Sequence, residues 1–135
     1  MRGQRNRPPH PDVRELAAIF AGGMLGALAR VALAQGFPHA RGAWPWATFS
    51  VNLAGALVLG WAVTRLPPAS YRRPFLGIGV CGALTTFATL QLELLHMLDD
   101  GRWGLALAYT AASLAGGLAA VRAGVVLARE PRRAP

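Results

Sequence analysis

Four long apolar stretches constrain this 135-residue chain more than any other feature of its sequence. Each approaches the roughly 20 residues that a helix needs to cross the hydrocarbon of a bilayer. The predicted membrane spans are residues 16–35, 46–64, 75–98 and 103–127. A composition that is 53% hydrophobic and only 15% charged leaves too little polar surface for a water-soluble domain. We therefore expect an all-α membrane protein with four transmembrane helices, a transmembrane domain at 15–128, and disordered basic tails at 1–14 and 129–135.

The basic residues, all fourteen of them arginines, indicate how the chain sits in the membrane. They flank the spans and form no stripe interleaved with aromatic residues, so the pattern argues against nucleic-acid binding. Arg30, Arg41 and Arg102 fall on one side, and the other eleven fall on the side that carries both termini. Because positive charge is retained on the cytoplasmic side, the sequence predicts a multi-pass protein with both termini in the cytoplasm.

Polar residues interrupt the third span near its centre. A break in the helix is predicted there, because Gly82 is followed shortly by two consecutive β-branched residues, Thr85 and Thr86. A break frees backbone carbonyls at membrane depth, and two such segments meeting in a dimer would offer oxygen ligands to a hard cation such as Na⁺. If the helix resumes beyond the break, Thr86, Thr89 and Glu93 lie on one stripe of it.

Uncharged hydrogen-bond donors occur in two other spans. Asn52 lies in the second span, and Tyr109 and Ser113 lie one turn apart in the fourth. A track of neutral donors suits a small anion, because fixed positive charge would hold the anion too tightly for release. The positive edge of the Phe87 ring adds to such a track. In the alternative interpretation, the hydroxyls bond back to their own helix carbonyls and Asn52 bridges two helices.

Three motifs, in order and at suitable spacing, give the chain a family resemblance. They are residues 22–30 (GGMLGALAR), residues 46–55 (WATFSVNLAG), and residues 79–87 (GVCGALTTF) followed by Glu93. With these motifs, the chain resembles the CrcB/Fluc family of fluoride-specific ion channels over residues 22–124. The resemblance implies a channel in the bacterial plasma membrane that lowers cytoplasmic fluoride by passive export, with no enzymatic step.

The resemblance also implies an antiparallel dimer with two fluoride pathways. A structural Na⁺, which is not transported, would lie at the dimer centre and be held by the backbone carbonyls of Gly82 and Thr85. The residues that the resemblance places along the fluoride pathway are Asn52, Phe87, Thr89, Tyr109, Ser113, Arg30 and Glu93. Arg30 would lie near an aqueous vestibule, and Glu93 matches an acidic position of the family whose role stays open.

Two residues depart from the family pattern. Leu90 stands where the family usually has a second phenylalanine, and Ala88 stands where it has a serine. A leucine presents no polarised ring edge to an anion, so one of the two pathways is expected to be weak or silent. The arginine asymmetry favours a single orientation, and an antiparallel dimer then requires an oppositely oriented paralogous partner.

Two further functions stay open. The chain could be a non-conducting partner that completes the channel of another subunit, as the substitutions at positions 88 and 90 suggest. It could also be a small proton-coupled multidrug-type exporter, but that mechanism needs a carboxylate at the membrane centre, and Glu93 lies late in its span. No catalytic constellation or nucleotide-binding loop occurs in the sequence, so the chain is not predicted to be an enzyme.

Overall fold

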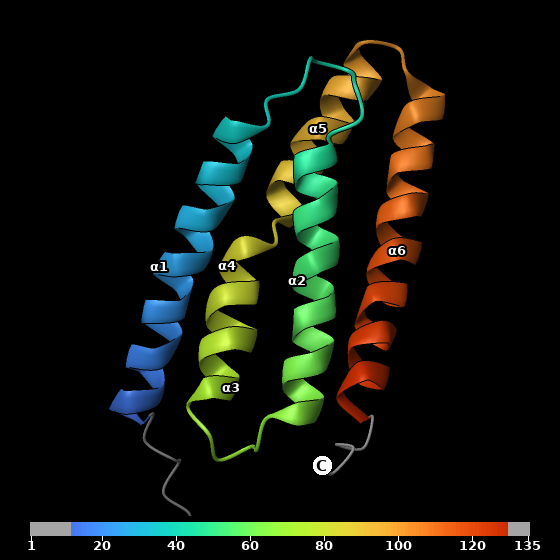
Figure 1. Cartoon of the computed structure of the whole chain (residues 1–135). Coiled ribbons are helices and arrows are strands. Elements are labelled where there is room, and N and C mark those ends of the chain that lie inside the picture. The colour runs from blue at the N-terminus through green and yellow to red at the C-terminus, as the bar shows by residue number, and fades with distance from the viewer. Residues whose placement is uncertain (1–11, 130–135) are drawn as a thin grey trace, which may run out of the picture.

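The computed structural model describes residues 12–129, which are helical apart from their connecting loops (Figure 1). The elements are α1 (Val13–Gly36), α2 (Trp46–Arg65), α3 (Arg72–Pro74), the π-helix η1 (Phe75–Cys81), α4 (Gly82–Leu84), α5 (Phe87–Asp99) and α6 (Trp103–Arg129). Together, α3, η1, α4 and α5 form the third span, Arg72–Asp99. All four spans are long and apolar enough to cross a membrane, which confirms the predicted all-helical fold with four transmembrane helices.

The observed ends of the spans lie within three residues of the predicted ones. The first span begins early, at Val13, because the Asp12 side chain caps the helix by accepting a hydrogen bond from the Arg14 backbone amide at 3.0 Å. Tyr71, from the loop between α2 and α3, donates to the other Asp12 oxygen at 2.8 Å. Val13 and Arg14 are therefore helical, as is Arg129 at the other end, whereas residues 1–11 and 130–135 of the predicted tails lie outside the described residues.

Glycines set how closely the spans approach one another. α1 packs against η1 and α4, and α2 packs against α6. A Cβ atom at Gly22 or Gly26 would collide with the carbonyl of Phe75 or Val80, and a Cβ atom at Gly124 would collide with the backbone of α2 at Leu57. Because these contacts are backbone to backbone, small residues are required for the helices to pack at this distance.

The loops divide the molecule into two ends (Figure 1). The first and last described residues lie at the same end as the loop between α2 and α3. The loops between α1 and α2 and between α5 and α6 lie at the opposite end, where Arg102 donates to the Gly42 carbonyl at 2.8 Å. α5 and the first turns of α2, which carry most of the candidate site residues, occupy the half of the bundle nearer this second end.

Large apolar side chains cover the outside of the bundle. Phe20, Leu107 and Leu114 are each at least 70% exposed, whereas the buried cluster is small and centres on Met97 and Tyr109. Such a surface would be unstable in water but suits contact with lipid or with another apolar subunit.

Candidate functional site

The backbone leaves the helical conformation at two residues in the middle of the third span. α4 ends at Leu84, Thr85 and Thr86 are extended with ψ angles of 145° and 117°, and α5 begins at Phe87. The Thr85 amide still bonds to the Cys81 carbonyl at 3.0 Å, but the Thr86 amide has left the helical ladder. An unpaired amide at membrane depth costs several kcal/mol. The chain must therefore supply other partners there.

Asn52 of α2 supplies them. Its Oδ1 accepts a hydrogen bond from the Thr86 amide at 2.9 Å, and its Nδ2 donates to the Thr86 carbonyl at 3.4 Å. One amide side chain thus satisfies both polar groups of the same residue. Since Nδ2 carries two hydrogens, the second one is left for another acceptor.

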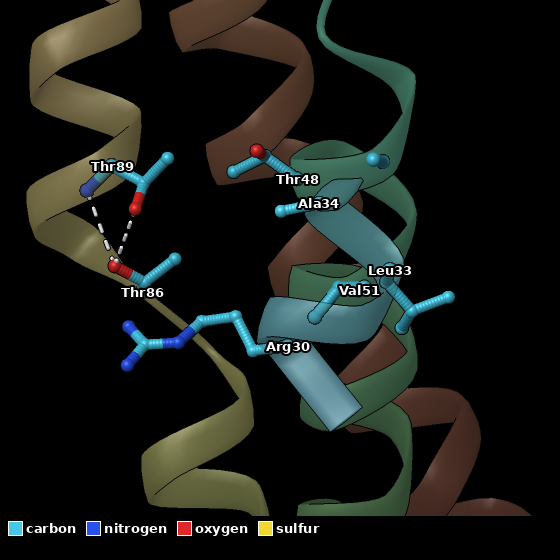
Figure 2. Close-up of a pocket in the computed structure, with 8 residues that line it drawn as sticks. Arg30, Leu33, Ala34, Thr48, Val51, Thr86 and Thr89 are labelled. Carbon is cyan, nitrogen blue, oxygen red and sulfur yellow. Dashed lines mark hydrogen bonds between the residues drawn. The ribbon is translucent and has the colours of Figure 1, made fainter. Parts of the chain in front are cut away.

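Thr86 then starts α5. Its hydroxyl accepts from the Thr89 amide at 3.1 Å, as an N-cap does, and donates to the Thr89 hydroxyl at 3.1 Å (Figure 2). Thr86 is only 9% exposed. The two threonines therefore hold each other in fixed positions at the start of α5.

A small pocket of about 50 Å³ opens beside this segment. It is lined by Arg30, Leu33, Ala34, Ala47, Thr48, Val51, Thr86 and Thr89. Figure 2 shows the Arg30 side chain reaching from α1 toward the segment that carries Thr86. The lining of the pocket thus contains one fixed positive charge and three hydroxyl groups, with apolar side chains between them.

Glu93 is a buried carboxylate, 7% exposed, that accepts hydrogen bonds from two other spans. The Thr48 hydroxyl of α2 donates to Oε1, and the Tyr109 hydroxyl of α6 donates to Oε2 at 2.7 Å. His39, from the loop between α1 and α2, lies with its Nε2 4.0 Å from Oε1. Hydrogen bonds to both oxygens offset the cost of burying the charge.

A second, wider cavity of about 270 Å³ lies beside Glu93, toward the end of the molecule that is opposite the described ends of the chain. It is lined by His39, Arg41, Gly42, Ala43, Thr89, Leu92, Glu93, His96 and Met97. Thr89 borders both cavities. A polar line therefore runs from Arg30 through Thr89 to Glu93 and on to the wider cavity.

The structure brings together most of the residues predicted from the sequence. Arg30 and Thr89 line the small pocket, Asn52 contacts it through Thr86, and Glu93 bonds to Tyr109. The Ser113 hydroxyl, one turn from Tyr109, is buried and has no hydrogen-bond partner among the described residues.

Phe87 is placed differently. Its side chain is 71% exposed and is not among the residues that line the two cavities on either side of Thr89. Leu90 packs instead against the buried cluster around Tyr109. Within this chain, the aromatic ring therefore faces outward, away from the polar line.

The interruption leaves a backbone carbonyl without its usual helical partner. Because the Thr86 amide bonds to Asn52, it is not available to the carbonyl of Gly82, four residues earlier. Gly82 is exposed, and a Cβ atom there would meet only the Gly77 carbonyl, at 4.0 Å. The Thr85 hydroxyl donates back to the Cys81 carbonyl at 2.8 Å. No cluster of three or more His, Cys, Asp or Glu within residues 12–129 could hold a metal ion.

Sequence reasoning missed Thr48 and His39 as parts of the site. Thr48 could have been found, because it lies four residues before Asn52 and thus on the same face of the second span. His39 lies in a loop, and no periodicity relates it to Glu93.

Comparisons with known proteins give a consistent result. The family model described as "CrcB-like protein, Camphor Resistance (CrcB)" matches residues 17–125. "Fluoride-specific ion channel FluC 1" of Mycobacterium bovis is 52% identical, over 92% of this chain and 97% of the relative. Two further relatives come from one strain of Streptomyces avermitilis, each 40% identical. "Fluoride-specific ion channel FluC 3" matches 84% of this chain and 58% of its own length, and "Fluoride-specific ion channel FluC 2" matches 78% and 69%.

Proposed function

Because the chain belongs to the CrcB family, we propose that it is a subunit of a fluoride-specific ion channel. It is a membrane channel and not an enzyme, and it lets fluoride leave the cytoplasm passively across the bilayer. The observation that carries the proposal is the polar line from Arg30 through Thr89 to Glu93, inside a bundle that exposes many large apolar side chains.

The geometry suits an anion that must replace water by hydrogen bonds. The hydroxyls of Thr48 and Tyr109 donate to the Glu93 carboxylate, so the donors left for an anion lie beside it. The free Nδ2 hydrogen of Asn52 and the hydroxyl of Thr89 add neutral donors nearby. Weak, successive sites of this kind allow an ion to enter and to leave.

A structural Na⁺ at the interruption belongs to the same proposal. The carbonyls of Gly82 and Thr85 would hold the cation, and Na⁺ would fix the interrupted segment without being transported. The support is the chemistry of the donor set, because carbonyl oxygens suit a hard cation. The Gly82 carbonyl has lost the Thr86 amide as a partner, and the residue is open to a neighbouring subunit.

The channel is proposed to be an antiparallel dimer with an oppositely oriented paralogous subunit, both termini of this chain being cytoplasmic. The arginine asymmetry supports one orientation, and the exposed Phe87 supports a role for that ring in contact with the partner. The two numbered relatives from one Streptomyces strain are consistent with paralogous subunits. The chain lacks a second aromatic ring at Leu90, so one pathway is expected to conduct weakly or not at all.

A non-conducting partner subunit is the second candidate, and Leu90 and Ala88 are the observations that favour it. A proton-coupled exporter fits less well. The centre of the third span is the interrupted segment at Thr85 and Thr86, and Glu93 lies in the half of the span beyond it.

Fluoride efflux from liposomes tests the proposal. The chain is reconstituted alone and with a candidate paralogue, with and without Na⁺, and efflux of fluoride is compared with efflux of chloride. Selective, Na⁺-dependent fluoride efflux is expected, and Thr89→Val should reduce it. The control is Thr110→Val, because the Thr110 hydroxyl bonds back to Ala106 within its own helix. Equal efflux of both anions would refute fluoride selectivity. Unchanged flux in Thr89→Val, both alone and with the paralogue, would favour the non-conducting role.

A further inference from the structure

The wider cavity beside Glu93 contains basic residues that the proposed pathway does not use. His39 and Arg41 enter it from the loop between α1 and α2, and His96 enters it from α5. Among the described residues, no group of three or more His, Cys, Asp or Glu is placed to hold a metal ion.

The charge of this cavity depends on its histidines. With both imidazoles neutral, Arg41 and Glu93 are the charged groups of the lining, and they cancel. Asp100 and Arg102 adjoin the wall at Gly42 and cancel in the same way. α6 contributes the Tyr109 hydroxyl, α2 contributes only the hydroxyl of Thr48, and α1 contributes Arg30 in the adjoining pocket.

Histidine side chains gain their proton between about pH 8 and pH 5. A proton on His39 would place a positive charge 4.0 Å from the Glu93 carboxylate and compensate the negative charge that repels an anion there. A proton on His96 would add to the same potential. Cavities lined by charge of one sign concentrate ions of the other sign.

We propose that the cavity formed by His39, Arg41, Glu93 and His96 is an anion-capture vestibule, and that protonation of His39 raises the flux of fluoride through it. The inference rests on the proposed channel function and adds a pH-dependent entry site to it. The vestibule lies at the end of the molecule opposite the described ends of the chain, so it responds to the pH on that side of the membrane.

Fluoride efflux at equal pH on both sides of the liposome membrane tests this. The chain is reconstituted together with the partner with which it conducts, and efflux from protein-free liposomes is subtracted because undissociated HF crosses lipid. Efflux is expected to rise roughly three- to tenfold between about pH 7.5 and about pH 5.5. His39→Gln should lose most of the rise, and His39→Arg should show at about pH 7.5 the flux that the parent reaches only at the lower pH.

His96→Gln is the matched control, since His96 lines the same cavity but makes no ion pair with Glu93. It should keep most of the rise. Elution of every variant at the volume of the parent in gel filtration checks that the channel is assembled. Pronounced efflux that is equal at both pH values, or a rise that persists in His39→Gln, would overturn the vestibule alone. Efflux no faster than that from protein-free liposomes at every pH would overturn the channel function as well.

Discussion

Replacing Asn52 by leucine should destabilise the fold by breaking the link between α2 and the interrupted third span. Leucine has nearly the same size, so packing is largely kept, but both polar groups of the Thr86 backbone lose their partner. An unsatisfied buried polar group costs about 1–3 kcal/mol in soluble proteins, and hydrogen bonds between membrane helices average about 0.6 kcal/mol. We expect a loss of about 2 kcal/mol, which lies between the upper end of the first range and the second figure. Most of it should come from the shorter bond, at 2.9 Å.

Reversible unfolding in mixed micelles, followed by tryptophan fluorescence, measures this loss. Thr64→Val is the matched control in the same helix, since the Thr64 hydroxyl bonds only to the Gly60 carbonyl one turn earlier, at 2.9 Å. It should change the free energy of unfolding by less than about 0.5 kcal/mol. If Asn52→Leu and Thr64→Val prove equally stable, the Asn52 bridge does not hold the interruption in place.

Three other changes have clear expected outcomes. Gly124→Ala should cost about 1–3 kcal/mol in micelle unfolding, because a Cβ atom there meets the backbone of α2, whereas Gly104→Ala, which has open space, should cost nothing. Tyr109→Phe removes one hydrogen bond from the buried carboxylate and should change fluoride efflux about tenfold, with unchanged efflux counting against a role in conduction. The hydrogen bond from Tyr71 lowers the pKa of Asp12, so this cap contact contributes stability above the ordinary carboxyl range and loses it as the pH falls through the lowered pKa. An NMR titration of Tyr71→Phe should show the Asp12 pKa moving up, and no movement would contradict the assigned cause.

Much of the site could be identified from single residues of the sequence. A polar group in an apolar span is costly, so Asn52, Thr89, Glu93 and Tyr109 stand out wherever their partners are. Their partners could not be identified in the same way. The periodicity of one helix fixes which residues share a face, but it does not fix the rotation of that helix relative to its neighbours.

Phe87 illustrates the difference. Its position next to the interruption marks it as a candidate for the pathway, yet its ring lies 71% exposed on the outside of the bundle. The rotation of α5 decides this, and that rotation follows from the Thr86 cap and from the packing of Leu90 against the cluster at Tyr109. The cap is local, but the contact between Leu90 and the cluster at Tyr109 joins two spans and cannot be inferred from spacing along the chain.

The sequence alone determined the four membrane spans, with ends correct to within three residues, because crossing a bilayer depends on the length and hydrophobicity of each segment separately. Only the tertiary structure decided that Asn52 pairs with the backbone of Thr86 and that Glu93 meets Thr48, Tyr109 and His39. The physical reason is that these contacts join different segments. Backbone contacts at Gly22, Gly26 and Gly124 set the distance between those segments, and that distance is a property of the packed bundle.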